Sequence, residues 1–143
     1  MKTFTRTFII NQSIDKVFNL INDVDAYKNF IPFCEHSRII ESNQNTITAQ
    51  LDLSFMSNTT RFITHNTFAS NEYITMKLIK GPFKEFTAKW GFKSLNESKT
   101  SLTFTMEYNI SNPLVNLAFT KNLNLVSEKI IKAFKKELTE KVY

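Results

Sequence analysis

The alternation of apolar and polar residues predicts strands along most of the chain. Between residues 47 and 55, apolar side chains occupy every second position, and Thr, Gln, Asp and Ser fill the positions between them. This pattern is typical of a strand with one buried face. The same alternation recurs at 3–10, 62–68, 74–78, 86–92 and 102–108, and it is less regular at 62–68. Residue pairs that favour turns separate these segments at Ser57-Asn58, Ser70-Asn71, Gly81-Pro82 and Asn96 to Ser98. The pattern therefore predicts a meander of about six or seven antiparallel strands.

Helical periodicity interrupts the meander after its first strand. Ser13 is a good N-cap, and the apolar residues after it have the i, i+3, i+4, i+7 spacing of one helical face. A second short helix follows, with Asp23 or Asp25 as its cap. Its apolar positions are Val24, Tyr27 and Phe30, and Pro32 ends it.

A long helix is predicted at the end of the chain. Asn112 is its N-cap, Pro113 stands at the first helical position, where proline is favoured, and the pattern extends to about Lys141. At ~1.5 Å per residue this helix would be roughly 40 Å long. The elements together predict an α+β fold. Because one helix is only about 10 Å across, it cannot cover a wide flat sheet, so we expect the sheet to curl around it.

The space between the curled sheet and the helix is expected to form an apolar ligand pocket. The same side chains could instead close into a solid core. Tyr27 and Phe30 could form a lid over the pocket mouth or simply pack on the sheet edge, and Phe83 could close one end. The residues expected to line the pocket are Phe62, Met76, Leu78, Phe86, Trp90, Phe104 and Met106 from the sheet, and Leu117 and Val126 from the helix.

Both glycines of the chain lie in the segment GPFKEFTAKWGF, residues 81–92. Gly81 and Pro82 are explained by a turn, in which glycine supplies an unusual φ and proline a fixed one. Gly91 stands within a predicted strand, where a glycine indicates a bulge or a bend that curls the sheet. Phe86, Ala88, Trp90 and Phe92 are expected to share the inner face of this strand.

Composition adds a basic surface to this picture. The chain has 143 residues, which fits one domain, and 18 Lys+Arg against 13 Asp+Glu give a net charge of +5. A solvated surface with a drifted composition is the favoured explanation, and attraction to nucleic acid or lipid is the alternative. On the last helix, acidic and basic residues interleave, which favours a solvated face. They are Lys129, Lys132, Lys135, Lys136 and Lys141 with Glu128, Glu137 and Glu140.

No group of residues in the sequence predicts catalysis or metal binding. Cys34 and His36 would share one face of a strand and could act as nucleophile and base or as two metal ligands, but no third ligand is close in sequence. Helix capping explains Asp23 and Asp25 more simply than acid–base chemistry does. Two glycines are too few for a phosphate-binding loop. We therefore predict a binding protein that is not an enzyme, with no catalytic residue and no metal.

Three segments carry a resemblance to a known family: NDVDAYKNFIPFC at 22–34, SRIIES at 37–42 and LIKGPFKEFTAKWGF at 78–92. Over essentially its whole length, the chain resembles the START-like (helix-grip) proteins of the coenzyme Q-binding family, which includes bacterial ribosome association toxins. The resemblance implies a strand, two helices, six further strands and a long C-terminal helix. It also implies that residues 1–143 form a single lipid-binding domain with an apolar tunnel between sheet and helix.

The resemblance implies two alternative functions. Members of the mitochondrial branch bind coenzyme Q, so ubiquinone or a similar quinone is the expected ligand and a membrane surface is a further expected contact. Bacterial relatives are linked to the large ribosomal subunit, where they block subunit joining. No mitochondrial transit peptide precedes Met1, which favours a bacterial chain in the cytoplasm or at the periphery of the inner membrane. DNA is not an expected partner.

Overall fold

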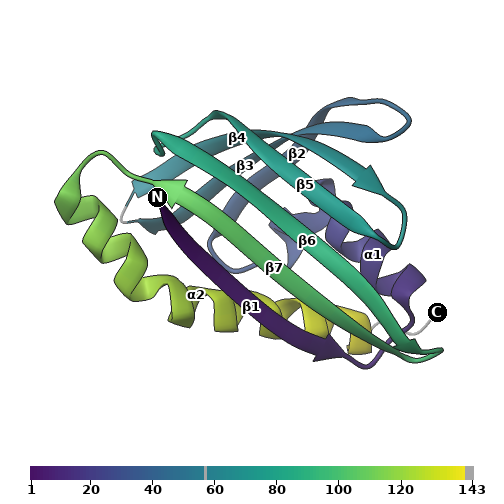
Figure 1. Cartoon of the computed structure of the whole chain (residues 1–143). Coiled ribbons are helices and arrows are strands. Elements are labelled where there is room, and N and C mark those ends of the chain that lie inside the picture. Colours follow the sequence, from purple (N-terminus) through teal and green to yellow (C-terminus); the bar gives the residue numbers. More distant parts are fainter. Residues whose placement is uncertain (57, 141–143) are drawn as a thin grey trace.

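The computed structural model of the chain describes residues 1–56 and 58–140. A seven-stranded antiparallel sheet curves around one long helix (Figure 1), which confirms the predicted α+β fold. The strand order is β1-β7-β6-β5-β4-β3-β2, so the first strand pairs with the last and the others follow as a meander. The elements are β1 (Lys2–Ile10), α1 (Ile14–Asn22), the 3-10 helix η1 (Val24–Asn29), β2 (Cys34–Ser42), β3 (Thr46–Met56), β4 (Asn58–Ala69), β5 (Tyr73–Lys80), β6 (Glu85–Asn96), β7 (Lys99–Asn109) and α2 (Pro113–Glu140).

The long helix extends along the sheet's concave side, and the short α1 meets it at one end (Figure 1). In Figure 1, α2 runs along that side with β1 next to it, and α1 is near the C-terminal end of α2. The predicted N-cap of α1 is confirmed, because the Ser13 hydroxyl accepts a hydrogen bond from the Lys16 N–H at 3.5 Å. On the inner side of α1, Phe18 packs edge-on against Phe92 of β6, with ring centroids 5.1 Å apart. The short helix is thus tied to the sheet by aromatic contacts.

Strand β2 has no regular alternation in the sequence, and the structure shows why. Its pairing with β3 shifts register twice, between Cys34 and His36 and between Ile39 and Glu41. Each β-bulge inserts a residue and reverses the side of the sheet that later residues face. The expectation that Cys34 and His36 share a face is therefore wrong, since Cys34 is buried and His36 is exposed.

The structure corrects one detail of the prediction for each glycine. Gly81 does not have a positive φ, so the expected unusual φ is wrong. Its lack of a side chain matters instead, because a Cβ there would lie 2.9 Å from a terminal methyl of Leu78 and 3.4 Å from the Phe62 ring. Gly91 is paired in register with Tyr73 of β5 and Thr103 of β7, and no shift occurs there, so a bulge at Gly91 is wrong, while the alternative of a bend stays a prediction. The register shift within β6 lies between Ser94 and Asn96.

The predicted turns coincide with strand connections. Asn71, between β4 and β5, has φ 64°, a left-handed conformation that asparagine tolerates. Its side-chain amide donates a hydrogen bond to the Asp15 carboxylate at 2.6 Å, which links this turn to α1. For the turn predicted at Ser57-Asn58, Ser57 lies outside the described residues and Asn58 begins β4. Lys141, the predicted end of the long helix, also lies outside them.

The apolar interior consists of two main packed clusters. One joins α1 and β2 to the C-terminal half of α2, and its most buried members include Leu102 and Phe134. The other surrounds the N-terminal half of α2 and includes Phe83 and Phe119. Partly buried side chains of β3 and β5, among them Met76, contact both clusters. The interior is therefore solid at its ends, and its middle is where a cavity could remain.

Candidate ligand-binding site

A cavity of about 250 Å³ lies between the concave face of the sheet and α2. It is many times larger than the space that one water molecule needs, and it is close to the lower end of the roughly 300–1,000 Å³ of ligand pockets. Its wall consists of inward side chains from all seven strands, α1, η1 and α2, and most of them are aromatic or aliphatic. The alternative of an entirely solid core is therefore wrong.

Most of the residues expected to line the pocket lie in this wall. They are Tyr27, Phe62, Met76, Phe83, Phe86, Trp90, Phe104, Met106 and Val126. Their contact with a ligand stays a prediction.

Three of the expected lining residues lie elsewhere. Leu117 is 65% exposed, because it is on the opposite side of α2 from the stripe through Phe119 that faces the sheet. Phe30 packs outside the wall against Phe134, with ring centroids 5.8 Å apart. Leu78 packs beside Phe62 in the second cluster. None of the three lies in the wall. For Leu117 the reason is that an apolar stripe on a helix does not say which of its edges reaches the interior.

Aromatic rings give the wall a fixed shape. Trp90 contacts Phe104 at a centroid distance of 4.7 Å and Phe134 at 6.0 Å, so it connects the sheet to α2. Phe83 makes an equivalent connection at the other end of the cavity. Its ring centroid is 5.0 Å from that of Phe86 in β6 and 5.3 Å from that of Phe119 in α2. Rings in such edge-on and tilted contacts stabilise one another, so the cavity is bounded by side chains that are already packed.

Polar groups in the wall are few. Among the described lining residues, the ionisable side chains are Arg6, Tyr27 and Cys34. Arg6 forms an ion pair with Glu128, which joins β1 to α2. The Tyr27 hydroxyl donates a hydrogen bond to the carbonyl oxygen of Ile21, and burial raises the pKa of its phenol. Burial also raises the pKa of the Cys34 thiol, which donates to the His36 carbonyl oxygen at 3.4 Å. Both groups therefore stay protonated and neutral at pH 7.

Asn22 of α1 and Ser127 of α2 are uncharged polar residues of the wall, and β4 contributes two more, Thr64 and Asn66. The sequence predicted the place of the two β4 residues on the inner strand face but did not single them out as site residues. Asn66 is 3% exposed, and its side-chain oxygen accepts no hydrogen bond from the described residues. The irregular alternation at 62–68 was the signal for these positions, because a polar residue at a buried position interrupts the pattern.

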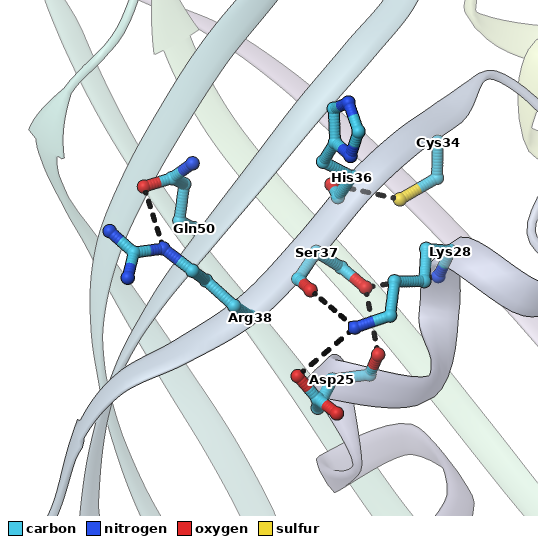
Figure 2. Close-up of polar contacts among 7 residues, drawn as sticks. All are labelled: Asp25, Lys28, Cys34, His36, Ser37, Arg38 and Gln50. Atoms are coloured by element: carbon cyan, nitrogen blue, oxygen red, sulfur yellow. Dashed lines mark hydrogen bonds and ion pairs between the residues drawn. The ribbon is translucent and has the colours of Figure 1, made fainter.

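A hydrogen-bonded group at the start of β2 fixes η1, and with it Tyr27, beside the cavity (Figure 2). The buried Ser37 hydroxyl accepts from the Lys28 N–H and donates to the Asp25 carbonyl oxygen, each at 3.0 Å. The Lys28 ammonium donates to the Ser37 carbonyl oxygen at 3.1 Å and pairs with the Asp25 carboxylate at 3.3 Å. Asp23 stands at the N-cap of η1 without a side-chain hydrogen bond, so a capping role for its side chain is wrong.

Replacing Ser37 with alanine should lower the free energy of unfolding by about 0.5–1.5 kcal/mol or somewhat more, because it removes two part-buried hydrogen bonds, to the Lys28 N–H and the Asp25 carbonyl oxygen. Urea unfolding followed by circular dichroism measures this change. Ser42→Ala, an exposed position on the same strand, is the control and should stay within about 0.5 kcal/mol of the parent. Equal values for the two variants would contradict the anchoring role of Ser37.

The described residues show neither a metal-ligand cluster nor a spanning helix. Residues 1–56 and 58–140 bring no three His, Cys, Asp or Glu side chains together as ligands. None of the helices in this part of the chain has the length and apolar character needed to cross a membrane.

A curved antiparallel sheet around a C-terminal helix, with an apolar cavity between them, defines the START-like class of proteins. Solved structures with this fold include a START superfamily protein from Mycobacterium smegmatis, with a TM-score of 0.84 and 17% identity over 95% of this chain and 96% of that one. The Zhui aromatase/cyclase from Streptomyces gives a TM-score of 0.88 with 14% identity over 96% and 93% of the two chains.

Sequence comparison gives the family. Residues 10–135 match the family described as polyketide cyclase/dehydrase and lipid transport, and the chain belongs to that family. A relative from Escherichia coli, named ribosome association toxin RatA, is 33% identical over 134 residues, which cover 94% of this chain and 85% of the relative. The suspected membership in a START-like family with ribosome association toxins among its relatives is thus confirmed.

The same comparisons contradict the prediction that the protein is not an enzyme. The family is described by cyclase and dehydrase activities as well as by lipid transport, and a protein named as an aromatase/cyclase shares the fold. The prediction relied on the lack of a catalytic motif in the sequence. Such reasoning fails when the fold brings the groups of a site together from separate strands and helices.

Proposed function

We propose that the cavity binds a hydrophobic ligand, and that this ligand is an isoprenoid quinone such as ubiquinone. The observation that carries the proposal is the apolar cavity between sheet and α2, with Trp90 and Phe104 in its wall. Each CH₂ group of a tail that leaves water for such a wall contributes about 0.8 kcal/mol to binding. The flat aromatic rings of the wall also suit a flat quinone ring. The lipid-transport part of the family description supports a ligand of this class.

Trp90 provides the test, because it is the single tryptophan of the chain and lies in the wall. Titration with decylubiquinone should quench its fluorescence and reach saturation. In parallel, the protein purified from its host is extracted with organic solvent, and the extract is analysed for quinones by mass spectrometry. The proposal fails if decylubiquinone leaves the fluorescence unchanged and no quinone or other lipid is found in the extract.

A second candidate function is association with the large ribosomal subunit. The relative from Escherichia coli that is named as a ribosome association toxin favours it, since the similarity covers nearly the whole of this chain. The exposed side of α2 offers basic groups for ribosomal RNA, with Lys132 and Lys135 both exposed. Contacts between lysines and RNA phosphates release counterions, so such binding weakens as salt rises. A ligand in the cavity and a ribosome on the outer side of α2 would not compete for the same side chains.

Reversing the charge at Lys132 and Lys135 should reduce the amount of protein that sediments with large subunits in a sucrose gradient by at least tenfold. The reason is that two attractive contacts with phosphates become repulsive. The control is Lys77→Glu with Lys93→Glu, which changes the net charge equally on exposed positions of β5 and β6. Co-sedimentation that survives the α2 reversal, or is lost equally in the control, would count against a binding site on α2.

A further inference from the structure

One buried polar atom in the cavity wall, the side-chain oxygen of Asn66, has no hydrogen-bond partner among the described residues. Asn66 lies in the middle of β4, is 3% exposed and belongs to the wall, and its side-chain oxygen accepts no hydrogen bond within residues 1–56 and 58–140. Its neighbours on the adjoining strands are Ile47 of β3 and Met76 of β5, which cannot supply a side-chain hydrogen bond. The amide therefore has apolar neighbours on both adjoining strands, and it borders the cavity.

A buried amide without a partner makes the unliganded protein less stable than an apolar side chain of the same size would. A leucine would fit the pattern of the surrounding wall, so the asparagine is a local exception to it. A ligand in the cavity would supply the hydrogen bond that the protein does not. The amide could donate to a carbonyl oxygen through its nitrogen or, after rotation about its last side-chain bond, accept from a hydroxyl group through its oxygen.

The charges around the cavity restrict the ligand further. Arg6, the basic residue among the described lining residues, is already paired with Glu128. A carboxylate or phosphate group in the interior would lose its hydration without gaining an opposite charge. A neutral oxygen-bearing group suits the site better, since an amide can pair with it fully.

We propose that Asn66 binds the hydroxyl or carbonyl group of a neutral, otherwise apolar ligand and thereby fixes how that ligand lies in the cavity. This inference rests on the proposed binding of a hydrophobic ligand, and it adds the residue that recognises the polar group. Thr64, two positions along β4 and also in the wall, is placed to contact the same end of the ligand.

The test compares two probes that differ in their oxygen atoms. Decylubiquinone has a decyl tail on an oxygen-bearing ring, and n-decylbenzene has the same tail on a ring without oxygen. Both are partitioned by equilibrium dialysis against the full chain, against Asn66→Leu and against Met76→Leu, a volume-conserving change in the same wall. In Asn66→Leu we expect the affinity for decylubiquinone to fall at least tenfold and the affinity for n-decylbenzene to stay equal or rise. Met76→Leu should change neither affinity more than about threefold.

The outcomes separate this inference from the proposed function. If the parent protein binds both probes and Asn66→Leu weakens both equally or neither, the recognition role of Asn66 is overturned while ligand binding stands. If the parent protein binds neither probe, both proposals fall. Asn66→Thr keeps a polar group and should retain part of the preference for decylubiquinone, which provides a second variant if the leucine variant does not fold. Without ligand, the urea midpoint of Asn66→Leu should equal or exceed that of the parent. A lower midpoint, together with an equal loss of affinity for both probes, would show that the Asn66 amide has a purely structural role.

Discussion

Replacing Phe134 with alanine is expected to lower the free energy of unfolding by about 3–5 kcal/mol, the range for a fully buried phenylalanine. Phe134 is 1% exposed, and it is the residue through which the C-terminal half of α2 contacts the rings of η1 and β6. Its ring centroid is 5.6 Å from that of Tyr27 in η1 and 6.0 Å from that of Trp90 in β6. Truncation removes these contacts and leaves a void that the surrounding rings cannot fill without moving.

Leu117→Ala is the matched control, because it removes an apolar side chain from the same helix at a position that is 65% exposed. Its effect should stay within about 0.5 kcal/mol. Urea unfolding followed by circular dichroism and by Trp90 fluorescence measures both variants. A loss below about 1 kcal/mol for Phe134→Ala would show that α2 does not pack on the sheet as described.

Replacing Val126 with phenylalanine is expected to weaken the binding of decylubiquinone at least tenfold, which corresponds to about 1.4 kcal/mol. Val126 lies on the side of α2 that forms the cavity wall, and a larger ring there occupies space that the ligand needs. Overpacking of the interior should cost about 1–3 kcal/mol of stability, so the variant is expected to fold. Phenylalanine is preferred to tryptophan because Trp90 then remains the single tryptophan whose quenching reports binding.

The neighbouring residue provides the control for this variant. Leu125 is 59% exposed, so Leu125→Phe adds the same ring on the outer side of the helix. Its affinity for decylubiquinone should equal that of the parent protein. Unchanged binding by Val126→Phe, with the fold intact by circular dichroism, would mean that the ligand does not enter the cavity between α2 and the sheet.

Local patterns predicted those parts of the fold that depend on local chemistry. The strict alternation at 47–55 and the cap at Ser13 were sufficient to place β3 and α1. The position of β2 was not predictable in the same way, because its two bulges against β3 remove the regular period. The space at Gly81 is limited by the local neighbour Leu78 and by Phe62 of β4, and the second of these is a tertiary contact that the sequence does not show.

The candidate site was predictable to a similar degree. The inward faces of the strands gave most of the wall, since a period of two determines which side chains share a face. The helix was less informative, because its broad apolar stripe included Leu117 on the exposed side as well as Val126 on the inner side. Asn66 looked like an irregularity in a strand pattern, and only its burial among apolar neighbours shows that an unpaired amide borders the cavity.

The pairing of β1 with β7 determines when the cavity can exist during synthesis of the chain. β1 has β7 as its single neighbour in the sheet, and its pairing runs from Lys2 with Tyr108 to Ile10 with Thr100. Contacts so distant in sequence form late, because a long loop must close before they are made. Translation begins at the N-terminus, so β1 leaves the ribosome about a hundred residues before its partner and remains an open strand edge in the meantime. α2, the other side of the cavity, follows later still. A hydrophobic ligand can therefore be enclosed only once nearly the whole chain has been made.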